Sequence, residues 1–178
     1  MNQPNDRFEW DRVIHVGRVL ELHDAGVRMP DGKVVQRDYV HYNGAAVILP
    51  VLADGSIVMI RNYRFAVGDT LWELPAGMID GDEAPLSAAT RELTEETGYS
   101  AGQIVKLGEF YAAPGSSDEL MHAFLATDLK DGLQALETYE QIEVHVLSDA
   151  TVRQMLRDGA IRDAKTVSAL ALYWLRGT

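Results

Sequence analysis

The sequence predicts an α/β (α+β) fold, in which helices pack on a mixed sheet and a small antiparallel β unit precedes the main domain. Segments with the apolar patterns of strands are interspersed with segments of helical period, which is typical of this class. The chain has 178 residues, 47% of them hydrophobic and 24% charged, so it can bury one core and its composition argues against disorder. We therefore expect an N-terminal unit over residues 1–43 and a main domain over residues 44–178.

The N-terminal unit is predicted from two β-like stretches, residues 13–23 and 34–42. Turn-forming residues at positions 29–32 separate them. So few strands cannot enclose a hydrophobic core of their own, so the unit must pack against another surface.

The main domain begins with a predicted hairpin around the turn residues Asp54 and Gly55. Its predicted strands cover residues 45–52, 56–61, 71–74, 104–111, 120–126 and 143–147, with a loop at residues 75–77. Two helices are predicted to close the chain, at residues 149–157 and 164–175.

A further helix is predicted between Pro85 and Gly98. Proline suits the first turn of a helix, where its missing N–H costs nothing, and glycine suits the residue at which a helix stops. Between them, residues at helical spacing define one buried face: Leu86, Ala89, Leu93 and Thr97.

Three acidic residues of this helix, Glu92, Glu95 and Glu96, stand together beside its apolar face. We expect Glu96 on the solvent-exposed side of the helix. Three carboxylates this close repel one another unless a cation lies among them, and Mg²⁺ prefers oxygen ligands of this kind. The triplet alone is compatible with a solvated acidic face or with a divalent-metal site.

The residues around the triplet favour the metal site, because they extend it into a longer pattern. From Gly77 to Gly98 the chain reads G-x5-E-x7-R-E-L-x-E-E-x-G. This pattern resembles the Nudix box, the loop–helix–loop motif of hydrolases that act on nucleoside diphosphates linked to another moiety. Tyr99 departs from the box, because the family usually has an aliphatic residue there. The resemblance covers the main domain and implies a Nudix α/β/α sandwich, with an ion pair between Glu83 and Arg91 that ties the loop to the helix.

The resemblance also implies a metal site. Glu92, Glu96 and the backbone carbonyl of Ala76 match metal ligands, which implies two or three Mg²⁺ ions, or Mn²⁺ in their place, bridging the diphosphate and activating a water. Glu95 matches a residue of the surrounding water and metal network, and all three glutamates are candidate catalytic residues.

Residues 72–80 resemble the ADP-ribose pyrophosphatase branch of the family, which often places the water-activating base on a mobile loop. The corresponding loop here covers residues 130–141, so the base is expected there. Glu140 matches the family's glutamate position best, as the base or as a further metal ligand. Glu137 is the alternative, since loop lengths vary. If neither acts, the role falls to Glu95 or to a metal-bound hydroxide alone.

Features outside the box narrow the substrate. Residues 72–80 and the position of Pro114 resemble the ADP-ribose pyrophosphatase branch, which implies that ADP-ribose is hydrolysed to AMP and ribose 5-phosphate. The substrate-binding residues implied by this branch are Arg64, Glu73, Pro114, Ser116 and Arg37. Broader action on nucleoside diphosphate sugars, such as GDP-mannose or ADP-glucose, is an alternative. A non-catalytic ADP-ribose-binding module is disfavoured, because the full set of glutamates is present.

Charge and composition argue against nucleic-acid and membrane partners. Sixteen basic and 27 acidic residues give a formal net charge of −11, which disfavours nucleic-acid binding. No apolar run approaches the ~20 residues of a membrane span, the N-terminus is not of signal-peptide type, and there is no cysteine. We therefore expect a cytoplasmic protein without a membrane or nucleic-acid partner. The resemblance implies a homodimer with exchanged N-terminal strands, because in this branch such strands pack across a two-fold axis.

Overall fold

The computed structural model describes residues 8–136, 138 and 140–176, and it divides into two units. The N-terminal unit contains the described residues up to Asn43 together with Tyr111–Leu120. The main domain contains Gly44–Phe110 and the described residues from Met121 onward. The combination of sheets and helices confirms the predicted α+β class.

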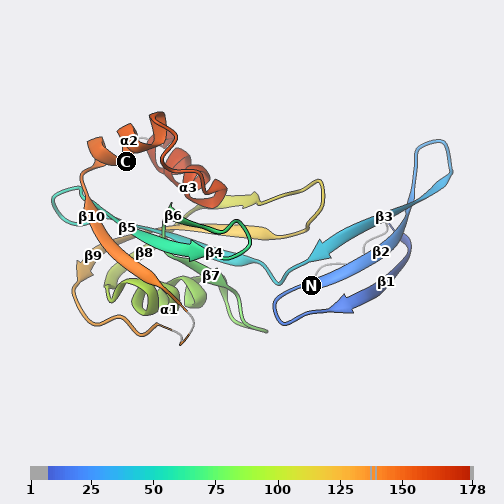
Figure 1. Cartoon of the computed structure of the whole chain (residues 1–178), viewed down its shortest axis with the longest axis horizontal. Coiled ribbons are helices and arrows are strands. Elements are labelled where there is room, and N and C mark those ends of the chain that lie inside the picture. The colour runs from blue at the N-terminus through green and yellow to red at the C-terminus, as the bar shows by residue number, and fades with distance from the viewer. Residues whose placement is uncertain (1–7, 137, 139, 177–178) are drawn as a thin grey trace. The chain divides into compact units, whose positions relative to one another are not determined.

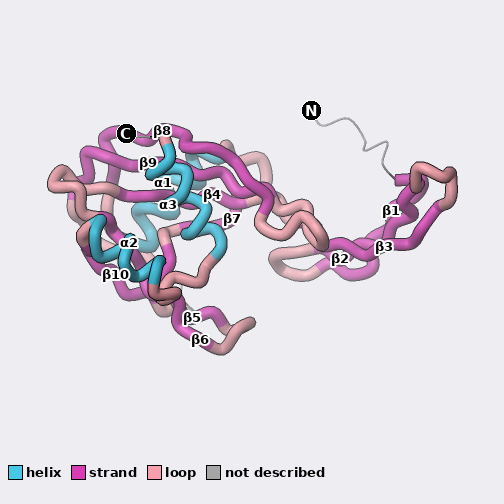
Figure 2. The backbone as a smooth tube through the Cα atoms, turned by 90° about the horizontal axis from the view of Figure 1, so that it is seen from above, coloured by secondary structure: helices cyan, strands magenta, loops and turns pink. Residues whose placement is uncertain are grey.

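The N-terminal unit is a three-stranded antiparallel sheet of β1 (Phe8–Val16), β2 (Glu21–Arg28) and β3 (Val34–His41), side by side in that order (Figure 1). Figure 2 shows these strands joined by loops. The continuous β-like stretch predicted over residues 13–23 is wrong. The chain turns between β1 and β2, where the N–H of Gly17 donates to the carbonyl three residues later at 2.8 Å. The strand-like pattern continues on both sides of this short turn and therefore conceals it.

One sheet of the main domain has the strand order β7-β4-β9-β8. Its buried strand β4 (Ala45–Pro50) pairs parallel with β9 (Leu120–Lys130) and antiparallel with β7 (Ala76–Met78). β8 (Ser100–Tyr111) lies beside β9. The loop predicted at residues 75–77 is therefore in part a strand, because β4 supplies it with a pairing edge that the local sequence does not show.

The second sheet of the main domain has the order β10-β5-β6, with antiparallel pairing throughout. It consists of β5 (Ile57–Arg64), β6 (Asp69–Glu73) and β10 (Ile142–Leu147). The predicted turn before β5 is present, and Gly55 adopts the left-handed conformation there, with φ of 83°.

All three predicted helices are present as α1 (Pro85–Thr97), α2 (Asp149–Arg157) and α3 (Ala164–Leu175). α1 lies on one side of β4, and α2 and α3 lie on the other (Figure 1). Leu86, predicted on the buried face of α1, is instead 49% exposed in the first turn. None of the helices within the described residues is long and apolar enough to cross a membrane.

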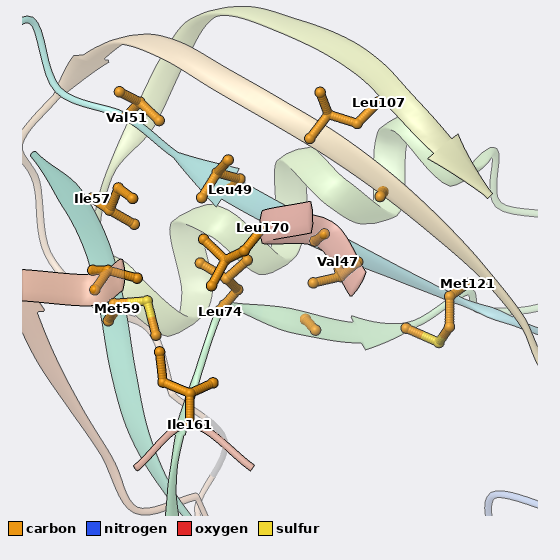
Figure 3. Close-up of a cluster of buried hydrophobic side chains, with 14 of the residues drawn as sticks. Val47, Leu49, Val51, Ile57, Met59, Leu74, Leu107, Met121, Ile161 and Leu170 are labelled. Carbon is orange, nitrogen blue, oxygen red and sulfur yellow. The ribbon is translucent and has the colours of Figure 1, made fainter. Parts of the chain in front are cut away.

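The alternating side chains of β4 explain the two helical layers. Ala46 and Ile48 join the cluster that contains the apolar face of α1. The opposite side of β4 joins the α3 cluster, where Leu49, Leu74 and Leu170 lie close together (Figure 3). A strand buried on both faces reads as the continuous apolar run that the sequence shows.

Candidate active site

The helix that carries the glutamate triplet, α1, is defined at both ends by the residues that predicted it. Pro85 occupies its first turn, and Gly98 ends it in the left-handed region with φ of 78°, donating its N–H to the carbonyl of Thr94. A Cβ on Gly98 would lie 2.8 Å from the carbonyl oxygen of Gly132. Only glycine therefore allows that loop to approach the end of the helix.

Two glutamates of the triplet, Glu92 and Glu96, are buried, which corrects the prediction that Glu96 faces solvent. Glu92 is 9% exposed and Glu96 is 3% exposed. The backbone of β7 covers them: Ala76 donates its N–H to Glu96 Oε2 at 2.8 Å, and a Cβ on Gly77 would lie 1.9 Å from Glu92 Oε1. Helical period cannot show this tertiary contact. Glu95 is only partly buried, with its side chain 38% exposed.

Burial makes these carboxyl groups hard to ionise. It raises the pKa of Glu96 to about 8, although the N–H of Ala76 and the charge of Arg64 act in the opposite direction. It also raises the pKa of Glu92, although the adjoining Arg91 lowers it. Buried carboxylates of this kind are stabilised when a cation joins them.

Arg91 connects the loop before α1 to the helix. Its Nε and Nη2 donate to Glu83 at 3.3 and 3.0 Å, so the predicted ion pair is present and holds the pKa of Glu83 below its ordinary value. Nη2 also donates to the carbonyl of Met78 at 3.0 Å. Nη1 reaches Glu92 at 2.6 Å and Glu95 at 3.2 Å. One guanidinium thus fixes both the loop and two glutamates.

The donor set on this face of α1 suits a divalent cation. Glu92 and Glu96 supply buried carboxylates, and the missing side chain of Gly77 leaves them room. Across the part of the chain that the structure describes, no three His, Cys, Asp or Glu side chains already surround one metal position. Mg²⁺ commonly takes one or two carboxylates and fills its other positions with water and phosphate oxygens. The two glutamates therefore fit such an ion without a third acidic side chain.

Glu140 lies near enough to the two buried glutamates for its charge to act on both. It is partly buried and stands just before β10. After burial, its negative charge is among the causes that raise the pKa of both Glu92 and Glu96, so it acts on the same site. Glu137, the alternative base, lies outside the described residues.

The loop that leads to Glu140 is fastened to the C-terminal end of α1. Gln134 donates from Nε2 to the carbonyl of Glu96 at 2.7 Å, and Ala135 donates its N–H to the carbonyl of Glu95 at 2.9 Å. The last carbonyls of a helix have no partner within the helix, so these bonds satisfy them. The loop therefore starts from a fixed point on the helix that carries the glutamates.

Arg64 lies at the end of β5, near enough to Glu96 for its charge to act on that carboxyl. It donates from Nε and Nη2 to Glu73 at 2.9 and 2.7 Å, and Lys165 donates to the same carboxylate at 2.5 Å. The Glu73 side chain is 1% exposed. Its carboxylate is thus enclosed by two cations, and the substrate-binding role expected of Glu73 stays a prediction.

The remaining predicted substrate residues, Arg37, Pro114 and Ser116, line one hollow of about 580 Å³ in the N-terminal unit. The loop that carries the last two is held along β3. The carbonyl of Ser116 accepts a backbone N–H of β3 at 2.9 Å, and Asp118 bonds to Nδ1 of His41 at 2.7 Å. The structure thus gathers these three residues, which lie far apart in the sequence.

Sequence reasoning missed Lys165, which lies 92 positions from Glu73. The available signal was the helix start around it, because Asp163 is a typical N-cap residue and accepts the N–H of Thr166 at 2.9 Å. That signal predicts where α3 begins. It does not predict that the start of α3 lies beside the end of β6.

Comparison with known proteins connects this geometry to a family. The model of the NUDIX domain matches residues 41–170. The chain is 34% identical over 165 residues to an ADP-ribose pyrophosphatase of Bacillus subtilis, covering 92% of this chain and 89% of the relative. It is 38% identical over 160 residues to a GDP-mannose pyrophosphatase of Cronobacter sakazakii, covering 83% of each. The crystal structure of an ADP compounds hydrolase matches with a TM-score of 0.78 and 26% identity, over 96% of this chain and 94% of that one.

Proposed function

The chain belongs to the NUDIX hydrolase family, and we propose that it hydrolyses ADP-ribose to AMP and ribose 5-phosphate. In this reaction a water oxygen bonds to one phosphorus, the bond from that phosphorus to the bridging oxygen breaks, and the bridging oxygen leaves on the other phosphate. The observation that carries the proposal is the burial of Glu92 and Glu96 against the glycine loop at Gly77. The ADP-ribose pyrophosphatase relative supports the choice of substrate.

NUDIX hydrolases generally depend on divalent metal ions, and Mg²⁺ or Mn²⁺ is the proposed cofactor here, as two or three ions. The proposed ligands are Glu92, Glu96 and the carbonyl of Ala76, with Glu140 as a further ligand. When bound, such ions neutralise the charge of the diphosphate and lower the pKa of the attacking water.

Glu140 is the proposed general base. A carboxylate at the end of a loop beside the buried pair can accept the proton of the attacking water as its oxygen bonds to phosphorus. The anchoring of that loop by Gln134 and Ala135 supports this role, because a base must be held within reach of its proton. Glu95, fixed by Arg91 at 3.2 Å, is the alternative.

Arg64 is the proposed contact to the phosphates. Its guanidinium presents planar, paired donors that suit phosphate oxygens, and it is near enough to Glu96 for the two charges to interact. Arg37, Pro114 and Ser116 are the further proposed substrate contacts, supported by the hollow that they share.

A wider substrate range is the second candidate function. The GDP-mannose pyrophosphatase relative, at 38% identity, favours it. The glutamates and Arg64 would serve any nucleoside diphosphate sugar, such as GDP-mannose or ADP-glucose, because they act on the diphosphate rather than on the base.

The protein is further proposed to be a homodimer with exchanged N-terminal strands. Several apolar side chains of β1 are exposed, among them Val13 at 48%, Ile14 at 51% and Val16 at 65%. A second copy would cover this surface, since a three-stranded sheet has no core of its own. A cytoplasmic location and the absence of nucleic-acid and membrane partners stay predictions.

A substrate panel with product chromatography tests the proposed function. ADP-ribose, GDP-mannose, ADP-glucose and a dinucleotide are compared by kcat/KM in the presence of Mg²⁺. The proposal predicts the highest value for ADP-ribose, with AMP and ribose 5-phosphate as products. A higher value for GDP-mannose would select the wider function instead, and tight binding of ADP-ribose without products would indicate a binding module.

A further inference from the structure

We propose that Glu73 and Lys165 are positioning residues that hold the guanidinium of Arg64 in place for the phosphates of the substrate. The proposal rests on the function proposed above, in which Arg64 contacts the diphosphate. It concerns residues that act through Arg64 and do not touch the substrate themselves.

The first step is the geometry of the Arg64–Glu73 pair. Two parallel hydrogen bonds, from Nε at 2.9 Å and Nη2 at 2.7 Å, fix the plane of the guanidinium. Among the described residues, nothing accepts a hydrogen bond from Nη1. The Arg64 side chain is 39% exposed, in contrast to its partner at 1%. Glu73 therefore binds the Nε–Nη2 edge of the guanidinium, and the edge that carries Nη1 is left for a ligand.

The second step is the attachment of Glu73 itself. Lys165 donates to Glu73 Oε2 at 2.5 Å and to Asp163 at 2.9 Å, and its side chain is only 17% exposed. The backbone N–H of Leu74, the next residue, donates to Thr166 Oγ1 at 2.8 Å. The first turn of α3 thus holds the end of β6 through a side chain and through the backbone. A carboxylate bound in this way cannot turn without breaking several bonds.

The third step is charge. Glu73 is shared between two cations, and Asp163 supplies a second negative charge to Lys165. The charges of the two cations, Arg64 and Lys165, balance those of the two anions, so the buried charges of the network are compensated. The negative charge of Glu73 therefore neutralises Arg64 only in part. The positive charge of the guanidinium still acts on Glu96. A phosphate beside that carboxylate would meet a cation held at a fixed place.

The main test is Lys165→Met, which removes the ammonium but keeps a long apolar side chain. We expect kcat/KM for ADP-ribose to fall about tenfold, mainly through KM, because loss of orientation at a contact residue has effects of this order. Lys165→Arg should restore most of the loss. Arg162→Met is the matched control, since Arg162 forms an exposed ion pair with Asp69 nearby and should leave kcat and KM unchanged. Glu73→Gln should lower kcat/KM for ADP-ribose by as much as Lys165→Met or more.

A double-mutant cycle separates positioning from other roles. If Lys165 acts through Arg64, then adding Lys165→Met to Arg64→Ala should lower kcat/KM by less than about twofold further. If the loss of kcat/KM in the double variant equals the product of the two single losses, Lys165 acts independently of Arg64. That result would overturn the proposal. A strong effect of Arg64→Ala beside an unchanged Lys165→Met would also overturn it. If Arg64→Ala itself leaves KM and kcat unchanged, the phosphate contact of the proposed function fails, and the positioning role fails with it.

Discussion

Glu92 and Glu96 show that burial, more than residue type, distinguishes a site from an acidic helix face. Both have neighbours of the same charge, and both lie against the backbone of β7 rather than in water. Ionised groups in such surroundings are unfavourable unless a cation compensates them. This imbalance is the physical reason to expect a divalent ion between these side chains and a diphosphate.

Glu96→Gln should abolish most turnover without unfolding the protein. The change removes a charged metal ligand, so we expect kcat to fall at least ~100-fold. Because the buried charge is itself unfavourable, the melting temperature of the metal-free variant should equal or exceed that of the wild type. Steady-state kinetics and thermal unfolding measure the two effects. Glu109→Gln, at an exposed residue paired with Lys106, is the control and should change neither. Normal turnover of Glu96→Gln at limiting Mg²⁺ would contradict the role.

Glu140→Gln tests the base. Here kcat should fall ~100-fold or more while KM changes little, because proton transfer occurs only on the way to the transition state. Glu143→Gln is a matched control, since Glu143 lies nearby in β10 with its side chain 69% exposed, and should be nearly normal. Glu137→Gln should lower kcat only slightly. A large loss of kcat in Glu137→Gln beside a small loss in Glu140→Gln would transfer the role to Glu137. Small losses in both would return the role to Glu95 or to the metal site alone.

Single residues differ in how far the sequence reveals them. The spacing of Glu92, Glu95 and Glu96 inside a complete box is a local pattern, so the amino-acid sequence alone reveals it. Their burial is not local, because the covering backbone comes from β7. Lys165 carries no pattern at all, since its partner Glu73 is reached only when α3 packs beside β6.

At the scale of elements, β7 and α1 act as one unit. Arg91 and the N–H of Ala76 join the strand and the loop to the helix, and Gly77 lets the two approach. The helix fixes the directions of its glutamates, and the strand fixes the space that they share. Metal ligands need this kind of rigid support.

Gly77→Ala should therefore impair activity more than stability. The new Cβ would meet the Glu92 carboxylate, which is the flexible end of a side chain and can move away. We expect kcat/KM to fall ~100-fold, because a displaced ligand loses its geometry, with a small change in melting temperature. Gly108→Ala is the opposite case: its nearest neighbour is a methyl of Leu172 at 3.2 Å, so it should cost about 1 kcal/mol of stability and leave kinetics unchanged. A fully active Gly77→Ala would contradict the close approach.

The elements themselves were predictable where their signals are local. Proline and glycine mark the ends of α1, and the hairpin turn at Gly55 uses the backbone freedom of glycine. The turn at Gly17 was missed because strand-like residues surround it, and β7 was missed because its pairing partner β4 is distant in sequence. Elements that depend on a distant partner escape local pattern reading.

At the scale of the whole molecule, the proposed dimer accounts for the exposed apolar side chains of β1. Ile14→Asp should shift the protein from dimer to monomer in light scattering, because a carboxylate cannot be buried at such an interface without a partner. Val105→Asp places the same charge at an exposed position of β8 and should leave the dimer intact. A wild-type protein that is monomeric and fully active would refute the exchange of strands.

The central claim is that this chain cleaves ADP-ribose with divalent metal held by α1. The most direct measurement follows AMP and ribose 5-phosphate from ADP-ribose by chromatography, with Mg²⁺, after chelation by EDTA, and after Mg²⁺ is restored. We predict equal amounts of the two products, no turnover with EDTA, and recovery on adding Mg²⁺. Turnover that persists in EDTA, or ADP-ribose that stays intact in the presence of Mg²⁺, would contradict the claim.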